Sequence, residues 1–314
     1  MYHSGMADSD SPDLNYEIAV LQRSPVQLGA PNRTRVAIDR WRNAELPSSD
    51  ALNLAQTMAK RVHRSAQIRR GFTRRTEQSA PPPPLSNILR SGRGSDVRLK
   101  LYLTMVWIAA QPPHSIRGTA SAWATLLDLD DPSGKGARQI RSSIRWLGKH
   151  QYVSDEGTPG VGMKVTLLSD LGTGDAYSVP GAAITRAKEA DEEPNPIDFY
   201  DNLPSGFWTR GWIHVLSGPA IAMLLVMLDV QRGRSEQDLW LSESVAQERY
   251  TLSEETRSKG LAELEAFELV TSAERRFRSN AMEAMRRRKV YRLYFDRLVG
   301  PIPLPGIDRP EADS

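Results

Sequence analysis

The stretch LSESVAQERYTLSEETRSKGLAELEAFELV, residues Leu241–Val270, carries the most specific local pattern in the chain. Its first part, Ser242–Tyr250, predicts a short helix, and Thr251–Leu252 form the turn that follows. Ser253 is a candidate N-cap for a second helix over Glu254–Phe267, because its hydroxyl can accept a hydrogen bond from a free backbone N–H. The stretch therefore predicts two helices joined by a tight turn.

The sequence on either side completes a compact unit. Upstream, Gly218–Gln231 predicts a strongly apolar helix, and its nine-residue apolar run Ala220–Leu228 fits a buried helix. A membrane span would need about 18 such residues. Downstream, Leu269–Ser272 and Val290–Phe295 predict two strands on either side of a basic insertion.

An earlier part of the chain follows the same plan. We expect helices over Asp96–Gln111, Ser121–Leu129 and Gly136–His150, and strands over Gln151–Val153 and Lys164–Leu168. A hairpin with Gly157, Gly160 and Gly162 would join these strands. Four apolar positions recur 117 residues later, since Ile144, Leu147, Tyr152 and Val153 match Leu261, Leu264, Leu269 and Val270. The chain is therefore predicted to contain an internal repeat.

The run Leu241–Val270 resembles the helix-turn-helix of bacterial winged-helix DNA-binding proteins, and Ser121–Val153 is similar with a more divergent turn. Helix, helix, turn, helix, strand, wing, strand is the plan of a winged helix-turn-helix. Two such units in one chain also resemble, in architecture, the tandem winged-helix initiators of plasmid replication. The resemblance implies an α+β fold, mainly α, with two tandem winged-helix domains that bind DNA.

The helix expected over Gly136–His150 separates a basic face from an apolar one. Four of its cations share a stripe about 80° wide at 100° per residue, and the apolar residues lie opposite. Such a helix suits the major groove of duplex DNA, although an ordinary amphipathic helix with a solvated face is the alternative. The DNA-binding candidates here are Lys135, Arg138, Gln139, Arg141, Ser142, Arg145 and Lys149. Base edges would be met by Gln139, Arg141 and Ser142, and phosphates by Arg145 and Lys149.

The second helix of the later unit is more acidic, and its basic residues lie mainly in the wing. Its outward-facing candidates for DNA contact are Ser253, Thr256, Ser258 and Lys259. The wing candidates are Arg275, Arg276, Arg278, Arg286, Arg287, Arg288 and Lys289. A basic wing can bind phosphate or place Arg in a minor groove. Two interpretations stay open for this unit, namely DNA contact and dimerisation to a homodimer.

The remaining segments look unlike the two units, which span 95–171 and 206–299. Residues 1–94 are expected to be a largely disordered basic arm, with a short helix at Ala51–Gln67 and a stiff spacer at Pro81–Pro84. Seven Lys and Arg and no acid lie between Lys60 and Arg75. This run is interpreted as a DNA-binding arm, a solvated tail or the product of an over-called start codon. Residues 172–205 are expected to be an acidic linker, and 300–314 a flexible tail.

Composition excludes several classes of protein. The absence of Cys excludes disulfide scaffolds, thiolate zinc sites, iron–sulfur clusters and cysteine nucleophiles. The five His residues are dispersed and no phosphate-binding loop is complete, so we expect no enzyme, no metal and no cofactor. The aromatic side chains, Trp240 among them, are expected to be structural. The N-terminal residues do not resemble a secretory signal.

These patterns predict a sequence-specific double-stranded DNA-binding protein of the bacterial cytoplasm, associated with the nucleoid. A net charge of only +3 conceals this, because basic and acidic segments cancel. The preferred role is transcription regulation, and the alternative is a non-catalytic replication initiator of a plasmid or mobile element. A third hypothesis is a scaffold whose winged helices bind protein. We expect no membrane association and find no small-molecule ligand indicated.

Overall fold

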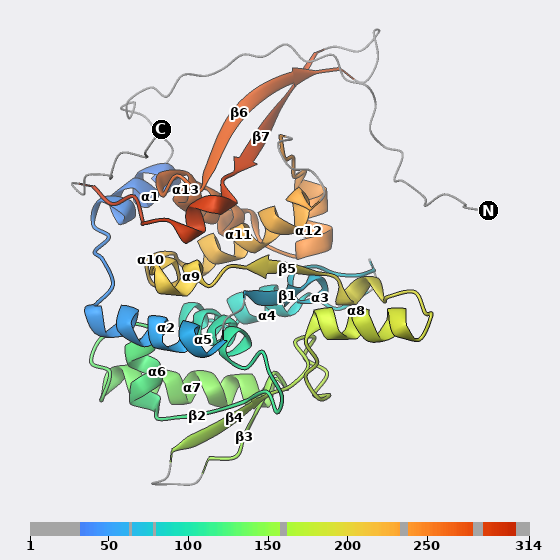
Figure 1. The fold of residues 1–314 in the computed structure, drawn as a ribbon. Helices are drawn as coiled ribbons and strands as arrows, with labels where there is room; N and C mark the ends of the chain where they lie inside the picture. The colour runs from blue at the N-terminus through green and yellow to red at the C-terminus, as the bar shows by residue number, and fades with distance from the viewer. Residues whose placement is uncertain are drawn as a thin grey trace.

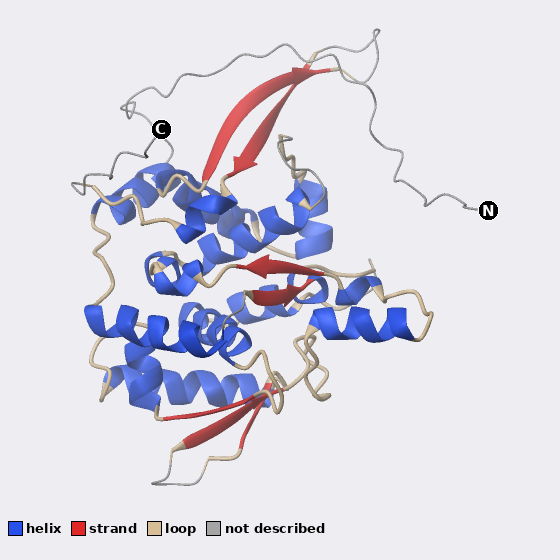
Figure 2. Ribbon diagram, viewed as in Figure 1, coloured by secondary structure: helices blue, strands red, loops and turns tan. Residues whose placement is uncertain are grey.

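Helices dominate the structure, and small antiparallel sheets accompany them (Figures 1 and 2). The computed structural model describes residues 32–62, 65–77, 80–157, 162–232, 238–278 and 285–305. The helices are α1 (Asn32–Arg42), α2 (Ser49–Val62), α3 (Arg70–Thr73), α4 (Pro84–Leu89), α5 (Ser95–Ile108), α6 (Ala120–Leu126), α7 (Lys135–Lys149), α8 (Pro180–Glu189), α9 (Gly206–Thr209), α10 (Trp212–Val215), α11 (Gly218–Gln231), α12 (Glu243–Tyr250), α13 (Glu254–Ala266), and the 3₁₀ turns η1 (Pro196–Asp198) and η2 (Phe295–Val299). The strands are β1 (Ala66–Arg69), β2 (Ser115–Gly118), β3 (Val153–Asp155), β4 (Met163–Leu167), β5 (Tyr200–Leu203), β6 (Val270–Phe277) and β7 (Arg286–Leu293).

Two parts of the chain share one order of elements. The first runs α5, β2, α6, α7, β3, β4, and its sheet has the order β2-β4-β3. The second runs α11, α12, α13, β6, β7, and an isolated bridge from Leu239 to Tyr291 takes the place of β2. In both, the short first strand therefore pairs with the last strand. The repeat predicted from the apolar positions corresponds to this common order.

Element boundaries follow the predictions most closely in the helices. Helix α11 has the bounds predicted for it, and the Ser253 hydroxyl caps α13 by accepting from the Thr256 N–H at 3.2 Å. The strands differ more. Strand β2 was not predicted, β3 begins where the predicted strand ends, and β6 and β7 continue into what was expected to be a basic loop. The predicted Gly160 position of the first hairpin lies outside the described residues.

The expectation of a disordered arm is wrong for the part of residues 1–94 that the structure describes. Helix α2 packs against α5, α6 and α9, and α1 packs along α13 (Figure 1). Ala51 and Ala55 are fully buried in this packing. Pro83 and Pro84, expected in a spacer, are buried where α4 begins. Small side chains can pack closely without forming a strong apolar pattern, so local periodicity does not reveal this core.

Three cations of the basic run between Lys60 and Arg75, namely Arg69, Arg70 and Arg74, form internal ion pairs, whereas Lys60 and Arg61 are exposed. Arg69 is buried, and its Nε donates to Asp170 at 2.6 Å while another guanidinium nitrogen pairs with Asp198. Its third contact is a hydrogen bond to the Ser178 carbonyl at 2.6 Å. Arg70 and Arg74 both reach the buried Asp229, whereas Arg64 lies outside the described residues. The prediction of a phosphate-binding arm therefore does not hold for Arg69, whose guanidinium is inside the protein.

The predicted linker also belongs to the folded body. Strand β5, within 172–205, pairs antiparallel with β1, so that Ala66 faces Leu203 and Arg69 faces Tyr200. Helix α8 extends beside this small sheet (Figure 1). In the expected tail, Ile302 and Leu304 are buried, and residues 306–314 lie outside the described residues. An acidic, Pro-rich composition predicted a linker because it does not reveal partners such as β1 and Arg69.

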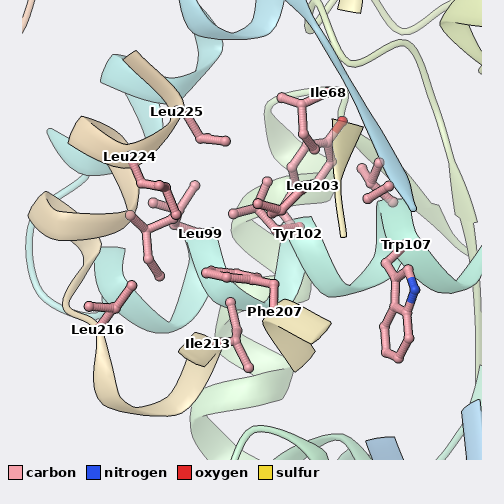
Figure 3. Packing of buried hydrophobic residues seen from close by; sticks show 14 of the residues in the cluster. Ile68, Leu99, Tyr102, Trp107, Leu203, Phe207, Ile213, Leu216, Leu224 and Leu225 are labelled. Carbon is pink, nitrogen blue, oxygen red and sulfur yellow. The ribbon is translucent and has the colours of Figure 1, made fainter. Parts of the chain in front are cut away.

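One continuous hydrophobic core joins all these segments (Figure 3). Leu99 and Tyr102 of α5 lie close to Leu224 and Leu225 of α11, and Ile68 of β1 joins them. Two polar contacts reinforce the same junction, because Asp96 accepts from the Gly218 N–H and Lys100 Nζ donates to the His214 carbonyl at 3.0 Å. The two repeats are thus packed together rather than separated by a linker.

Helix α13 crosses α11 closely at Gly260, and this contact gives a stability prediction. A Cβ at Gly260 would lie 2.2 Å from the Pro219 carbonyl oxygen and 2.7 Å from Met223 Cγ. Gly260→Ala is therefore expected to lower the free energy of unfolding by about 1–3 kcal/mol, because the helices must separate. Gly148→Ala in α7 is the matched control, since its Cβ would meet nothing closer than the Val153 carbonyl at 3.7 Å.

The control is expected to stabilise the protein by up to about 1 kcal/mol, because Ala has a higher helix propensity than Gly. Urea denaturation followed by circular dichroism measures both changes. Equal effects of the two substitutions would contradict the close crossing at Gly260.

Candidate nucleic-acid interface

Helix α7 presents the basic face that the sequence predicts. Ala137, Ile140, Ile144 and Leu147 are buried against the body of the first unit. The polar candidates are all exposed, namely Lys135, Arg138, Gln139, Arg141, Ser142, Arg145 and Lys149. At the start of the helix, the Asp131 carboxylate accepts from the backbone N–H groups of Gly134 (3.1 Å) and Lys135 (2.8 Å). The helix is therefore held firmly while its basic face meets solvent.

The cations of this face have few internal partners. Lys135 lies 3.8 Å from Asp130. Within the described ranges, no carboxylate lies within 4 Å of the charged nitrogens of Arg138, Arg141, Arg145 or Lys149. Four like charges on one helix face repel one another. An anionic partner with repeated charges would relieve that repulsion.

A groove of about 700 Å³ separates α7 from the β3–β4 hairpin. Arg141, Arg145 and Lys149 form one side, and Asp155 and Met163 belong to the other. Thr119 at one end is a residue that the sequence reasoning missed, although its position before a helix is an N-cap signal, and its hydroxyl accepts from the Ala122 N–H at 3.0 Å. A sugar–phosphate backbone could enter such a basic groove while the helix reads the adjacent major groove.

Helix α13 is a poorer candidate, because another part of the chain already covers it. Helix α1 packs along α13, with Arg33 Nη1 3.0 Å from Glu254 and Arg40 Nε 3.0 Å from Glu263. Of the predicted contacts, Lys259 is paired with Glu255 at 2.6 Å, Ser253 is exposed as the cap, and Thr256 and Ser258 are half-buried. The Lys259 hydrogen bond lowers the pKa of Glu255.

The β6–β7 hairpin divides its seven predicted cations into two groups. In the first group, Arg275 contacts Asp238 at 2.7 Å, Lys289 contacts Glu265 at 3.3 Å, and Arg288 stacks on Trp240 and Phe277 at 3.5 and 3.9 Å from their ring centroids. The second group is exposed and comprises Arg276, Arg278, Arg286 and Arg287, of which Arg287 lies 3.7 Å from Glu274. Trp240 is 42% exposed rather than in the core. The Arg288 guanidinium lies over its ring, so the expectation that Trp240 is a core residue is wrong.

The two basic surfaces lie at opposite ends of the molecule. In Figure 1, α7 and the β3–β4 hairpin lie at the bottom, whereas the β6–β7 hairpin projects from the top. The structure therefore does not bring the candidates of the two units into one site. Among the described residues, no group of three or more His, Asp or Glu could hold a metal ion.

No protein-family model, curated protein or solved structure matches this chain. In the described part of the chain, no helix combines the length and the apolar character needed to cross a membrane.

Proposed function

We propose that this chain is a double-stranded DNA-binding protein that reads the major groove with α7. The observation that carries the proposal is the face of Arg138, Arg141, Arg145 and Lys149, which is exposed and without carboxylate partners in the described ranges. Guanidinium groups on an amphipathic helix can bind guanine edges and phosphates together. Gln139 and Ser142, exposed between these cations, are the neutral candidates for base contacts.

The order of elements supports the proposal that both units are winged helices. Each has a helix, a short strand position, two helices and a hairpin, and in each the short strand pairs with the last strand. In the first unit, the β3–β4 hairpin would be the wing and the groove beside α7 the path of a DNA backbone. In the second unit, α1 occupies part of α13, so we assign DNA contact to the β6–β7 hairpin alone.

The hairpin contribution can be tested separately from α7. Replacing Arg276, Arg278 and Arg287 by Gln is expected to weaken binding about equally for specific and random duplexes. Flexible cations on a hairpin meet phosphates, which carry no sequence information directly. Fluorescence anisotropy with both duplexes measures the two affinities. A loss confined to the specific duplex would contradict the assignment, and binding unchanged on both would remove the hairpin from the interface.

The biological role follows from where the protein binds. We propose transcription regulation, with replication initiation of a plasmid or mobile element as the alternative and a protein-binding scaffold as the third. Capturing fragmented genomic DNA on the purified protein and sequencing it distinguishes them. Enrichment of promoters supports regulation, and direct repeats at an origin support initiation. Absence of any enrichment would contradict sequence-specific DNA binding and favour the scaffold. The partner bound by the scaffold could then be a second copy of this chain, which would give a homodimer.

A further inference from the structure

A cavity of about 640 Å³ lies between α3, the end of α11 and α12. Five arginines from these segments line it, namely Arg70, Arg74, Arg75, Arg232 and Arg249. It is distinct from the groove beside α7, with which it shares no lining residue. Part of its wall is apolar and is formed by Trp240, Leu241 and Val245.

Internal carboxylates compensate only part of this positive charge. Asp229 is buried and interacts with Arg70 Nε at 2.7 Å and with Arg74 Nη1 at 3.5 Å. Asp229 Oδ2, the oxygen near Arg74, also accepts from the Tyr250 hydroxyl at 2.7 Å. Asp201 lies 3.3 Å from Arg232. Two guanidinium groups therefore share the single buried carboxylate at the bottom of the cavity.

The other two arginines have no ion-pair partner in the described ranges. Among the described residues, the Arg75 side chain donates one long hydrogen bond of 3.4 Å, to the Glu248 carbonyl, and Arg249 is exposed. Two glutamates, Glu77 and Glu248, also line the cavity, but both are exposed and neither is within 4 Å of a described cation.

Two further observations concern the buried donors of this cluster. The Nε atoms of Arg74 and Arg75 are buried and have no hydrogen-bond partner among the described residues. Leaving such donors unpaired costs about 1–3 kcal/mol each, so a rearrangement that pairs them would be favourable. Burial lowers the pKa of Arg74, and the neighbouring Arg70 and Arg249 charges lower it further, against the opposing effect of Asp229.

We propose that this cavity binds an organic phosphate, with the phosphate group on Arg74, Arg75 and Arg249 and the apolar part against Trp240 and Leu241. Arginine suits this ligand, because its planar group donates two parallel hydrogen bonds to phosphate oxygens. The volume is within the range of about 300–1,000 Å³ that is typical of small-molecule sites. The site goes beyond DNA reading by α7 and does not depend on it.

Isothermal titration of the full-length protein with ATP and with pyrophosphate tests the site. The variant Arg75→Gln with Arg249→Gln removes two cations that hold no ion pair, so it should fold. Arg35→Gln with Arg186→Gln is the control, since both residues are exposed on other helices and the charge change is the same. We expect ATP to bind the wild type and the control equally, and the cavity variant at least about tenfold more weakly, a loss of about 1.4 kcal/mol.

Duplex DNA binding identifies the source of the phosphate. If ATP binding is lost in the cavity variant while DNA affinity is unchanged, the ligand is a soluble phosphate. If both are lost and ATP displaces DNA from the wild type, a backbone phosphate occupies the cavity. Equal ATP binding by the cavity variant and the wild type, or no binding of either probe to the wild type, overturns the proposal. The variant with Arg138, Arg141 and Arg145 replaced by Ala separates DNA reading by α7 from phosphate binding by the cavity. It should lose affinity for duplex DNA and keep its affinity for ATP.

Discussion

Replacing Arg138, Arg141 and Arg145 by Ala is expected to weaken binding to a specific duplex by at least about a hundredfold. Each good contact to a base edge or phosphate contributes about 1–3 kcal/mol, and three would be lost. The plot of log affinity against log salt should also flatten, by roughly 0.9 for each phosphate contact removed. Fluorescence anisotropy over a series of NaCl concentrations measures both quantities.

The control for this variant replaces Arg35, Arg186 and Lys188 by Ala, which removes the same charge from exposed positions on α1 and α8. It should lose little affinity, since only the long-range field of the protein changes. Circular dichroism should give the same unfolding midpoint for both variants, because all six side chains are exposed. An unchanged affinity and salt slope in the α7 variant would refute the assignment of α7 as the reading helix.

Arg69→Met is expected to destabilise the protein by about 3–5 kcal/mol, the usual result of removing one partner from a buried ion pair. Arg69 connects β1 to Asp170, Ser178 and Asp198, so the substitution leaves two carboxylates without their cation. Met nearly fills the volume of the aliphatic part of the Arg69 side chain. The measured destabilisation therefore reports the loss of the charge and not the loss of packing. Urea unfolding at pH 7 measures the difference.

The pH dependence of this variant gives a second measurement. Burial raises the pKa of Asp170 to about 6 from a reference value of 3.8, and Arg69 opposes the rise. A carboxyl whose folded pKa exceeds its unfolded pKa loses stability as pH rises between the two values. Without Arg69, the pKa of Asp170 in the folded protein rises further. The difference in stability between the wild type and Arg69→Met should therefore be much larger at pH 8 than at pH 5. Adding Asp170→Asn should reduce this dependence, and parallel pH curves for the wild type and Arg69→Met would contradict it.

Sequence patterns predicted the helices of the two repeats because those helices depend on regular apolar spacing. Helix α11 is apolar on all sides, and α7 is apolar on one side. Both patterns can be recognised in a stretch of sequence as short as about four helical turns. Strand β2 was missed because it is only four residues long and follows a Pro-Pro pair. Four residues are too few to show the alternation of apolar and polar side chains that is typical of a strand. Segments such as α2 and β1 gain their stability from partners far away in the sequence, which local periodicity cannot show.

For the candidate site, the sequence predicted which cations α7 presents but could not show which other cations are already paired. The charge of Arg69 or Arg275 looks the same in a sequence whether a buried carboxylate or water surrounds it. Asp170 and Asp238, which neutralise these two, are 101 and 37 residues away. The cavity at Arg74 was missed for the same reason, because its lining comes from three separate segments.

The pairing of β1 with β5 has a consequence for how the chain acquires its structure during synthesis. Strand β1 leaves the ribosome more than 130 residues before the strand that completes its sheet. Arg69 obtains the Ser178 carbonyl and Asp198 only after residues 178 and 198 have been made, so its buried position cannot form before then. Strand β1 must therefore wait unpaired for a segment that follows the first repeat, and nascent chains stopped before residue 200 should be more sensitive to protease than the finished protein.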